Sequence, residues 1–323
     1  MTGSGPMKRK VEDIDIRDKN SVDQLVSQFG ASGVFGAGRV KKAADILEDM
    51  INIGARIYLG LAGAMVPGGM RRVISDMIDD GMVHVLVSTG ANITHDLMCS
   101  LGIPQWRDLR YESDAELRSK GISRIYDSFL DDGAFEEFES RIQPILGKCF
   151  ESTEKDAIAP SELIHEIGGR LDDQHSIVAS ACRRDVPIFV PAFTDSILGL
   201  QTFFYSQAHS IRLDVLADLK RIIDISYQEG PSGAILVGGG VPKNFILQSK
   251  LVAPGAFSRC VQITTDRPEP GGLSGATLEE AVSWGKLEVE AKSITVYGDA
   301  TIILPIIVAS VRERLSSGEP VER

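Results

Sequence analysis

The chain has 323 residues, of which 43% are hydrophobic and 24% charged, as is typical of a globular enzyme with a sizeable core. Its net charge of −11 argues against a nucleic-acid-binding protein and favours a cationic substrate or a basic protein partner. The four cysteines are far apart and predict neither a disulfide framework nor a zinc site. Because the sequence has no signal peptide and no 18-residue apolar run, we expect a cytoplasmic protein with no membrane contact. Because neither the histidines nor the cysteines have metal-ligand spacing, we expect no metal.

The N-terminal part of the chain predicts a disordered or extended segment over residues 1–20, followed by helices. A short helix is expected over 21–30, a glycine-rich loop over 30–38, and an amphipathic helix over 39–52 with one apolar stripe. We interpret residues 21–323 as a single α/β catalytic domain that begins with this helical segment.

From Arg56 onward, short apolar runs alternate with helical patterns. Continuous apolar strands separated by helices indicate an α/β fold, a Rossmann-like parallel sheet with helices on both faces. A charged and mostly helical insertion is expected around residues 106–169. The expected strands are 56–61, 82–88, 187–190, 234–237, 260–264 and 294–297, and the clearest helices are 70–79 and 212–226.

Small-residue turns follow five of these strands, at 60–63, 88–92, 191–195, 238–240 and 297–300. In an open parallel sheet, ligands bind at the carboxyl ends of the strands, where small residues let backbone N–H groups approach a pyrophosphate. Tight packing explains any one such turn, but five together predict a nucleotide crevice. No G-x-G-x-x-G fingerprint is present. Asp195 and Asp299 could accept hydrogen bonds from ribose hydroxyls or could cap helices.

Histidines give a weaker signal. His95 is expected at the start of a helix behind a strand end, where it could accept a proton or could hold the loop, and both interpretations stay open. His84 lies within an expected strand and is interpreted as structural. No pair of histidines has metal-ligand spacing.

The stretch from Gly271 to Lys286 combines a glycine-rich turn with a short helix. Thr277 and Glu280 have the spacing of a capping box, and Gly285 stands where the helix should end. Lys286 follows directly, close to Trp284. Desolvation favours the neutral, nucleophilic amine of a lysine, so Lys286 is a candidate nucleophile. The alternative is an ordinary lysine at a helix C-terminus.

The sequence of this stretch, Ser-Gly-Ala followed by Glu-Glu-Ala-Val-Ser-Trp-Gly-Lys, resembles the active-site segment of deoxyhypusine synthases. The resemblance extends to Thr89-Gly-Ala, Pro191-Ala-Phe-Thr-Asp, Gly238-Gly-Gly-Val and Val296-Tyr-Gly-Asp-Ala. Val-Pro-Lys-Asn-Phe and Gln-Ile-Thr-Thr-Asp are most similar to the archaeal branch. Altogether, the resemblance to this family covers residues 35–312.

The resemblance implies an NAD-dependent aminobutyl transferase. Hydride transfer to NAD would turn the secondary amine of spermidine into an imine, and Lys286 would take over the aminobutyl group. A lysine of the translation initiation factor 5A precursor would then receive it, in a tunnel at a subunit interface of a homotetramer. The implied cofactor residues are Thr89, Gly90, Ala91, Asp195, Gly239, Gly240, Thr265, Asp299 and Ala300, with His95 as a further contact; the implied substrate residues are Glu280, Trp284, Ser274 and Asn244.

The sequence departs from the eukaryotic pattern at four positions. Asn244 replaces a histidine, Leu200 and Leu273 replace carboxylates that bind the polyamine, and His95 replaces a glutamate. Two alternatives therefore stay open. One is a related aminobutyl transferase that uses agmatine as donor or putrescine as acceptor, as in homospermidine synthesis. The other is a non-catalytic NAD-binding paralogue.

Overall fold

The computed structural model describes residues 9–17, 20–107, 112–151 and 157–317. Its centre is a six-stranded sheet in the order β6-β2-β1-β7-β8-β9, with every neighbouring pair parallel. Numbered along the chain, this is the 3-2-1-4-5-6 order of dinucleotide-binding sheets, so the prediction of a Rossmann-like parallel sheet is confirmed. The strands are β1 (Arg56–Leu61), β2 (Val85–Ser88), β6 (Ile188–Phe189), β7 (Ser232–Val237), β8 (Phe257–Thr264) and β9 (Leu287–Tyr297).

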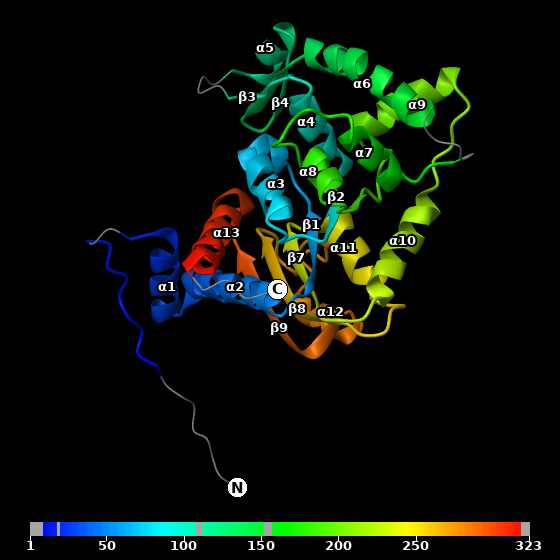
Figure 1. The fold of residues 1–323 in the computed structure, drawn as a ribbon. Helices are drawn as coiled ribbons and strands as arrows, with labels where there is room; N and C mark the ends of the chain where they lie inside the picture. The colour runs from blue at the N-terminus through cyan, green and yellow to red at the C-terminus, as the bar shows by residue number, and fades with distance from the viewer. Residues whose placement is uncertain (1–8, 18–19, 108–111, 152–156, 318–323) are drawn as a thin grey trace.

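Side chains of β1 alternate between two hydrophobic cores, as the period of a strand requires. Ile57, Leu59 and Leu61 join the larger core, whereas Tyr58 joins the smaller one on the opposite face. Helices α2 (Phe35–Asn52), α3 (Arg71–Asp79), α4 (Gly90–Ser100) and α13 (Ala300–Ser317) contribute to the larger core. Helices α10 (Val215–Tyr227), α11 (Gly240–Ser249) and α12 (Leu278–Ser283) contribute to the smaller one. Figure 1 shows these two helical layers on either side of the sheet.

The N-terminal helices differ from the expectation. Residues 9–17 and 20 have no regular secondary structure, and α1 (Val22–Ser32) begins with the capping box of Ser21 and Gln24. The glycine-rich loop expected over 30–38 is wrong, because α1 runs to Ser32 and α2 begins at Phe35. Gly33 ends α1 with a φ of 68°, and a Cβ on Gly38 would lie 2.6 Å from the Gly33 backbone. The glycines therefore permit a tight helix–helix turn.

The insertion contains a small antiparallel sheet that the sequence did not predict. Its strands β3 (Trp106–Arg107), β5 (Ser128–Asp131) and β4 (Ile122–Ile125) pair in that order. The expected helical content is present as α5 (Asp114–Ser119), α6 (Gly133–Glu151) and α7 (Pro160–Gly168). The short strands lack a sustained period-2 pattern, and their hairpin turns at Tyr126, which has a φ of 55°.

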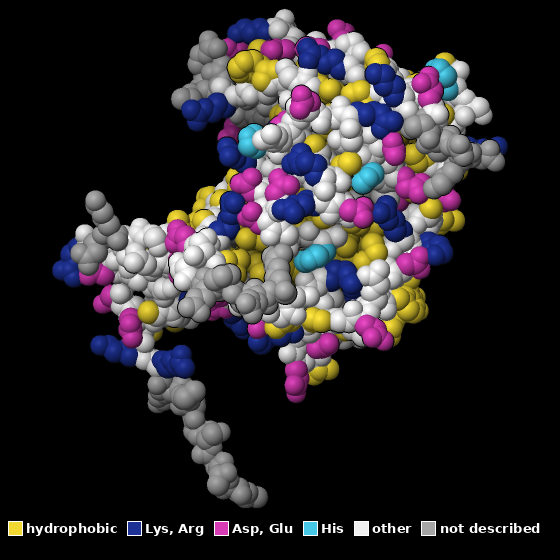
Figure 2. Space-filling view, viewed as in Figure 1, with side chains coloured by type: hydrophobic (Ala, Val, Ile, Leu, Met, Phe, Trp, Pro, Cys, Tyr) yellow, Lys and Arg dark blue, Asp and Glu magenta, His cyan; other side chains and the backbone are white. Residues whose placement is uncertain are grey.

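The remaining described elements are η1 (Val66–Met70), α8 (Ile177–Arg183) and α9 (Ile197–Ala208). Acidic and basic side chains are interspersed on the face of the molecule drawn in Figure 2. Across the described ranges, no helix has the length and apolar character needed to cross a lipid bilayer.

Candidate active site

The turns that follow the strands lie side by side at the carboxyl edge of the sheet. The strand ladder continues into these turns by four backbone hydrogen bonds, each from the N–H of a turn residue to the carbonyl of a neighbouring strand. They join Thr89 to Leu61 (3.2 Å), Ala62 to Val237 (3.0 Å), Gly238 to Ile263 (2.7 Å) and Gly298 to Thr264 (3.0 Å). Residues 62, 89, 238 and 298, which are far apart in the sequence, therefore share one edge.

The topological switch point lies between β1 and β7, because the chain continues from β1 to β2 on one side and from β7 to β8 on the other. Helices α4 and α11 begin beside it and pack on opposite faces of the sheet. Neither helix has a side-chain N-cap hydrogen bond. Their first-turn N–H groups, which belong to residues such as Gly90 and Gly240, can therefore bind an anion such as pyrophosphate.

Glycines shape the turns at this switch point, where the sequence predicts a nucleotide crevice. Gly238 and Gly240 have φ values of 70° and 57°, which disfavour other residues. A Cβ on Gly239 would come within 2.2 Å of the Ser274 Cα, and a Cβ on Gly90 within 2.5 Å of the Ser196 Cβ. These two glycines allow close packing of neighbouring turns, whereas Gly240 faces open space, since a Cβ there would meet nothing within 4 Å.

Asn92 is a buried residue of the crevice that sequence reasoning missed. Its amide group donates to the Gly63 carbonyl (2.9 Å) and Thr89 Oγ1 (3.1 Å), and accepts from the Val66 N–H (3.1 Å). Asn92 thus ties the turn after β1 to the turn after β2. The only sequence signal was an asparagine at the start of a helix, which is common at such positions.

The two aspartates expected to contact ribose lie at the same edge in different settings. Asp299 caps α13, since its Oδ1 accepts from Thr301 N (2.8 Å) and Thr301 Oγ1 (2.9 Å). Asp195 is exposed in the turn before α9, and its N–H donates to the Ala192 carbonyl (3.0 Å). Thr265 is exposed directly after β8, and Ala300 begins α13.

Lys286 follows a short helix whose two ends are well defined. Thr277 Oγ1 accepts from Glu280 N (3.1 Å) at the start of α12. At its end, Gly285 has a φ of 68° and donates to the Val282 carbonyl, while Lys286 N donates to the Ala281 carbonyl, both at 2.9 Å. This pair of bonds is a Schellman motif, so the backbone of Lys286 has a fixed position.

The side chain of Lys286 is half-buried, and its ammonium lies 5.4 Å from the ring centroid of Trp284. Trp284 itself is 61% exposed. The ring can stabilise the cation and cover one side of the amine. The Glu280 carboxylate is exposed on the first turn of α12.

The other proposed substrate residues lie nearer the crevice. Asn244 belongs to the first half of α11, where its amide donates to Gln248 Oε1 (3.1 Å), and Ser274 packs against Gly239. By contrast, the Lys286 carbonyl accepts from the N–H of Phe257, the first residue of β8 (3.0 Å). Because the strands are parallel, the backbone of Lys286 lies toward their amino ends, away from the glycine turns.

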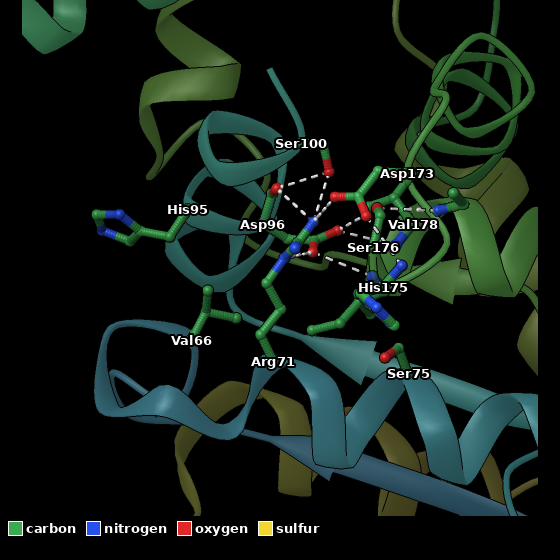
Figure 3. A network of polar contacts seen from close by, with 12 residues as sticks. Val66, Arg71, Ser75, His95, Asp96, Ser100, Asp173, His175, Ser176 and Val178 are labelled. Atoms are coloured by element: carbon green, nitrogen blue, oxygen red, sulfur yellow. Dashed lines mark hydrogen bonds and ion pairs between the residues drawn. The ribbon is translucent and has the colours of Figure 1, made fainter. Parts of the chain in front are cut away.

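His95 lies in the second turn of α4, not at its start. It is 8% exposed, burial lowers its pKa to about 4, and Gln105 Nε2 lies 2.5 Å from its Nδ1. The imidazole is therefore neutral at neutral pH, which favours a contact or a positioning role over proton uptake. In Figure 3, His95 points away from the polar network around Asp96.

That network joins α3, α4 and α8. Asp96 is fully buried and accepts from Arg71 Nε (2.6 Å), Ser176 Oγ (2.8 Å), Ile177 N (3.0 Å) and Val178 N (2.9 Å). Arg71 also binds Asp173 (2.6 Å) and Ser100 (2.7 Å). Each side chain of this network is hydrogen-bonded to another part of it, so we interpret its role as holding the three helices together.

A cavity of about 340 Å³ lies at the small antiparallel sheet, and its lining contains none of the candidate site residues. Its lining mixes apolar with acidic and basic side chains: Trp106, Arg107, Glu112, Leu117, Lys120, Ile122, Phe129 and Asp131.

Within the part of the chain that the structure describes, no group of three or more His, Cys, Asp or Glu residues could hold a metal ion.

Comparison with known proteins identifies the family. A sequence model of the deoxyhypusine synthase family matches residues 24–311. A probable deoxyhypusine synthase of Methanosarcina mazei is 45% identical over 297 residues, covering 92% of each chain. One of Methanothermobacter thermautotrophicus is 44% identical over 306 residues, covering 94% of this chain and 98% of the relative. The fold is also similar to a crystal structure assigned as a deoxyhypusine synthase of Entamoeba histolytica, with a TM-score of 0.64, 18% identity and coverage of 94% and 96%. The chain therefore belongs to the deoxyhypusine synthase family of enzymes, as the Ser-Trp-Gly-Lys segment between α12 and β9 led us to expect.

Proposed function

We propose that the protein transfers the aminobutyl group of spermidine, with NAD as cofactor, to a specific lysine of the translation initiation factor 5A precursor. The observation that carries the proposal is Lys286, fixed by the Schellman motif of α12 and lying beside Trp284. The family match over residues 24–311 supports the same reaction class.

The crevice at the switch point fits a dinucleotide. Thr89, Gly90 and Ala91 at α4, with Gly239 and Gly240 at α11, would bind the pyrophosphate through backbone N–H groups. Asp195, Thr265, Asp299 and Ala300 at the same edge would contact the ribose units. NAD, when bound, supplies the hydride acceptor and later the hydride donor for the amine–imine interconversion. His95, which is buried and neutral, would help to hold α4 in place.

The covalent step belongs to Lys286. Its Nζ would form a bond to the imine carbon of the donor, and the bond from that carbon to the diamine nitrogen would break. The aminobutyl group would then move from Lys286 Nζ to the acceptor lysine, which restores the free amine. Trp284 would exclude water from the imine, while the Glu280 carboxylate, with Ser274 and Asn244, would bind the ammonium end.

The proposal includes a homo-oligomer, a tetramer as in the family, located in the cytoplasm. Exposed apolar side chains around the candidate site support a partner copy: Val241 is 47% exposed, Leu273 43% and Trp284 61%. The separation of Lys286 from the glycine turns within one chain supports a site completed by a second copy. The net charge of −11 favours a polyamine and a basic acceptor protein.

A looser choice of donor is the second candidate. Leu200 and Leu273, 41% and 43% exposed, stand where the eukaryotic enzymes have polyamine-binding carboxylates, and neither side chain can accept a hydrogen bond. A donor with a different far end, such as agmatine, could therefore compete. In a competition assay at fixed NAD, a preference for spermidine of about 1,000-fold in specificity constant, about 4 kcal/mol, would contradict this candidate.

The test of the proposed function compares two lysine variants. Lys286→Ala should abolish aminobutyl transfer and leave NAD binding nearly intact, because Lys286 lies away from the glycine turns. Lys292→Ala is the matched control, since Lys292 pairs with Asp49 on the surface (3.1 Å) and should keep full activity. Transfer by Lys286→Ala within about tenfold of wild type would contradict the proposal.

A further inference from the structure

Two buried side chains hold the turn that precedes α12. Lys243, 3% exposed, lies in the first turn of α11, and Gln262, 1% exposed, lies near the end of β8. Lys243 Nζ donates to Gln262 Oε1 (3.3 Å), to the Leu273 carbonyl (3.4 Å) and to the Ala276 carbonyl. Gln262 Nε2 donates to the Ser274 carbonyl (3.0 Å) and to the Gly238 carbonyl (3.3 Å). Three carbonyls of one turn are therefore bound by side chains from other elements.

The ammonium of Lys243 is satisfied without a carboxylate in hydrogen-bonding contact among the described residues. Its three N–H donors match three neutral oxygen acceptors. Burial lowers its pKa, as expected for a cation taken out of water. Burying a charge costs several kcal/mol unless hydrogen bonds compensate, and an apolar residue could fill the same space. A packing role alone therefore does not explain a lysine here.

The turn needs such support, because its own structure is weak. Residues 271–276 include three glycines, and α12 has only six residues, too few for a helix to be stable alone. The turn also packs closely on neighbouring backbone at two points, so its position must be held accurately. A Cβ on Gly275 would lie 1.9 Å from the Arg267 carbonyl oxygen, and one on Gly239 would lie 2.2 Å from the Ser274 Cα.

Lys243 stands between the two halves of the candidate site. Gly240, three residues earlier, is at the crevice, while Ala276 directly precedes Thr277, the N-cap of α12. Lys243 is also close enough to interact electrostatically with Glu280 and Lys286. We propose that Lys243 is a positioning residue, which fixes the Leu273–Ala276 turn on the crevice and thereby sets the position of Lys286. This inference rests on the proposed function.

The experiment compares two buried lysines of one helix region. Lys243→Met removes the three hydrogen bonds and keeps most of the side-chain volume. Lys250→Met is the matched control, because Lys250 is 7% exposed and follows α11 directly. Its ammonium donates to the Ser226 carbonyl (3.5 Å) and lies 4.9 Å from the Phe257 ring, and among the described residues it has no hydrogen bond to the Leu273–Ala276 turn. Both variants are incubated as full chains with NAD and radiolabelled spermidine, and the imine on Lys286 is trapped with borohydride.

We expect Lys243→Met to lower kcat and the rate constant for labelling Lys286 by about 100-fold, the effect of a displacement near 1 Å. The Kd for NAD and the KM for spermidine should stay within about threefold, because the lost interaction serves the reacting geometry. Lys250→Met should label Lys286 at the wild-type rate. A merely structural role would lower the melting temperature of both variants without this selective loss of kcat.

Labelling of Lys286 in Lys243→Met at the rate of Lys250→Met would overturn the inference. If Lys243→Met does not fold, Gln262→Met decides, since it releases the Ser274 carbonyl and removes one Lys243 acceptor. It should reduce labelling by about tenfold, and unchanged labelling would refute the positioning role. Failure of the wild-type chain to label Lys286 at all would instead contradict the proposed function.

Discussion

The two halves of helix α4 differ in whether their polar groups have hydrogen-bond partners within the protein. In its second half, Asp96 is fully buried and accepts four hydrogen bonds, from Arg71, Ser176 and the first two residues of α8. At its start, no side chain caps the helix, and Gly90 lies beside the glycine turns at the switch point. All the hydrogen bonds that the Asp96 carboxylate accepts come from other helices or the residues beside them, so this carboxylate joins α3, α4 and α8. The first N–H groups of α4 have no side-chain acceptor and can bind a ligand. The structural region and the candidate binding region are both polar, and they differ in whether the polar groups are already hydrogen-bonded.

The largest expected effect tests the structural half of α4, by replacing the buried Asp96 carboxylate. Asp96→Ala should lower the free energy of unfolding by about 4 kcal/mol, since it leaves Arg71 short of a partner and the start of α8 without acceptors. Asp79→Ala is the control, because its carboxylate is 35% exposed and pairs with Arg183 on the surface, so a loss below about 1 kcal/mol is expected. Urea unfolding of both variants gives the answer, and equal losses would remove the distinction.

A smaller effect is expected from His95, on the same helix. Its folded-state pKa of about 4 lies below the ordinary 6.5, so the unfolded chain binds a proton first as the pH falls. Stability is therefore lost between about pH 6.5 and pH 4, by up to about 3 kcal/mol. His95→Gln keeps an acceptor for Gln105 but cannot titrate, and should remove this dependence.

The measurement must be the difference between wild type and His95→Gln. Asp218 acts in the opposite direction over the same interval, since burial raises its pKa to about 6 and the folded chain binds that proton first. Subtracting the two pH–stability curves cancels this contribution. Parallel curves from pH 7 to pH 4 would mean that the imidazole is not shielded from water as the structure indicates.

The parts of the fold that could be predicted are those with a local signal. Runs such as Ile57–Leu61 and Ala234–Val237 are apolar at every position, as buried parallel strands are. Strand β9 was expected only over 294–297, although residues 287–292 alternate apolar and charged side chains, a period-2 strand signal that the expectation left out. The glycines of 30–38 indicated a loop, whereas their role is the close approach of two helices.

The candidate site divides in the same way. The motif that ends in Lys286 and the turns at the strand ends are local, so the sequence could indicate them. Lys243 and Gln262 act through partners that lie 12 to 33 residues away in the sequence. Asn92 acts by joining two separate turns, through partners 26 and 29 residues away. The neutral state of His95 depends on burial, which one sequence does not show.

The smallest expected effect concerns the candidate binding region, at the carboxyl edge of the sheet. Asp195→Ala and Asp299→Ala should each weaken NAD binding by about 1–3 kcal/mol, the cost of leaving a ribose hydroxyl without its acceptor. Asp299→Ala should also lower the stability of the chain by about 1 kcal/mol, because Asp299 caps α13. Asp299→Ser separates the two effects, since serine is a good N-cap but cannot supply a carboxylate. We therefore expect Asp299→Ser to restore the melting temperature and to leave NAD binding weak. NAD titrations that match the wild type for both Asp195→Ala and Asp299→Ser would show that neither aspartate contacts the cofactor, and would leave Asp299 as a helix cap alone.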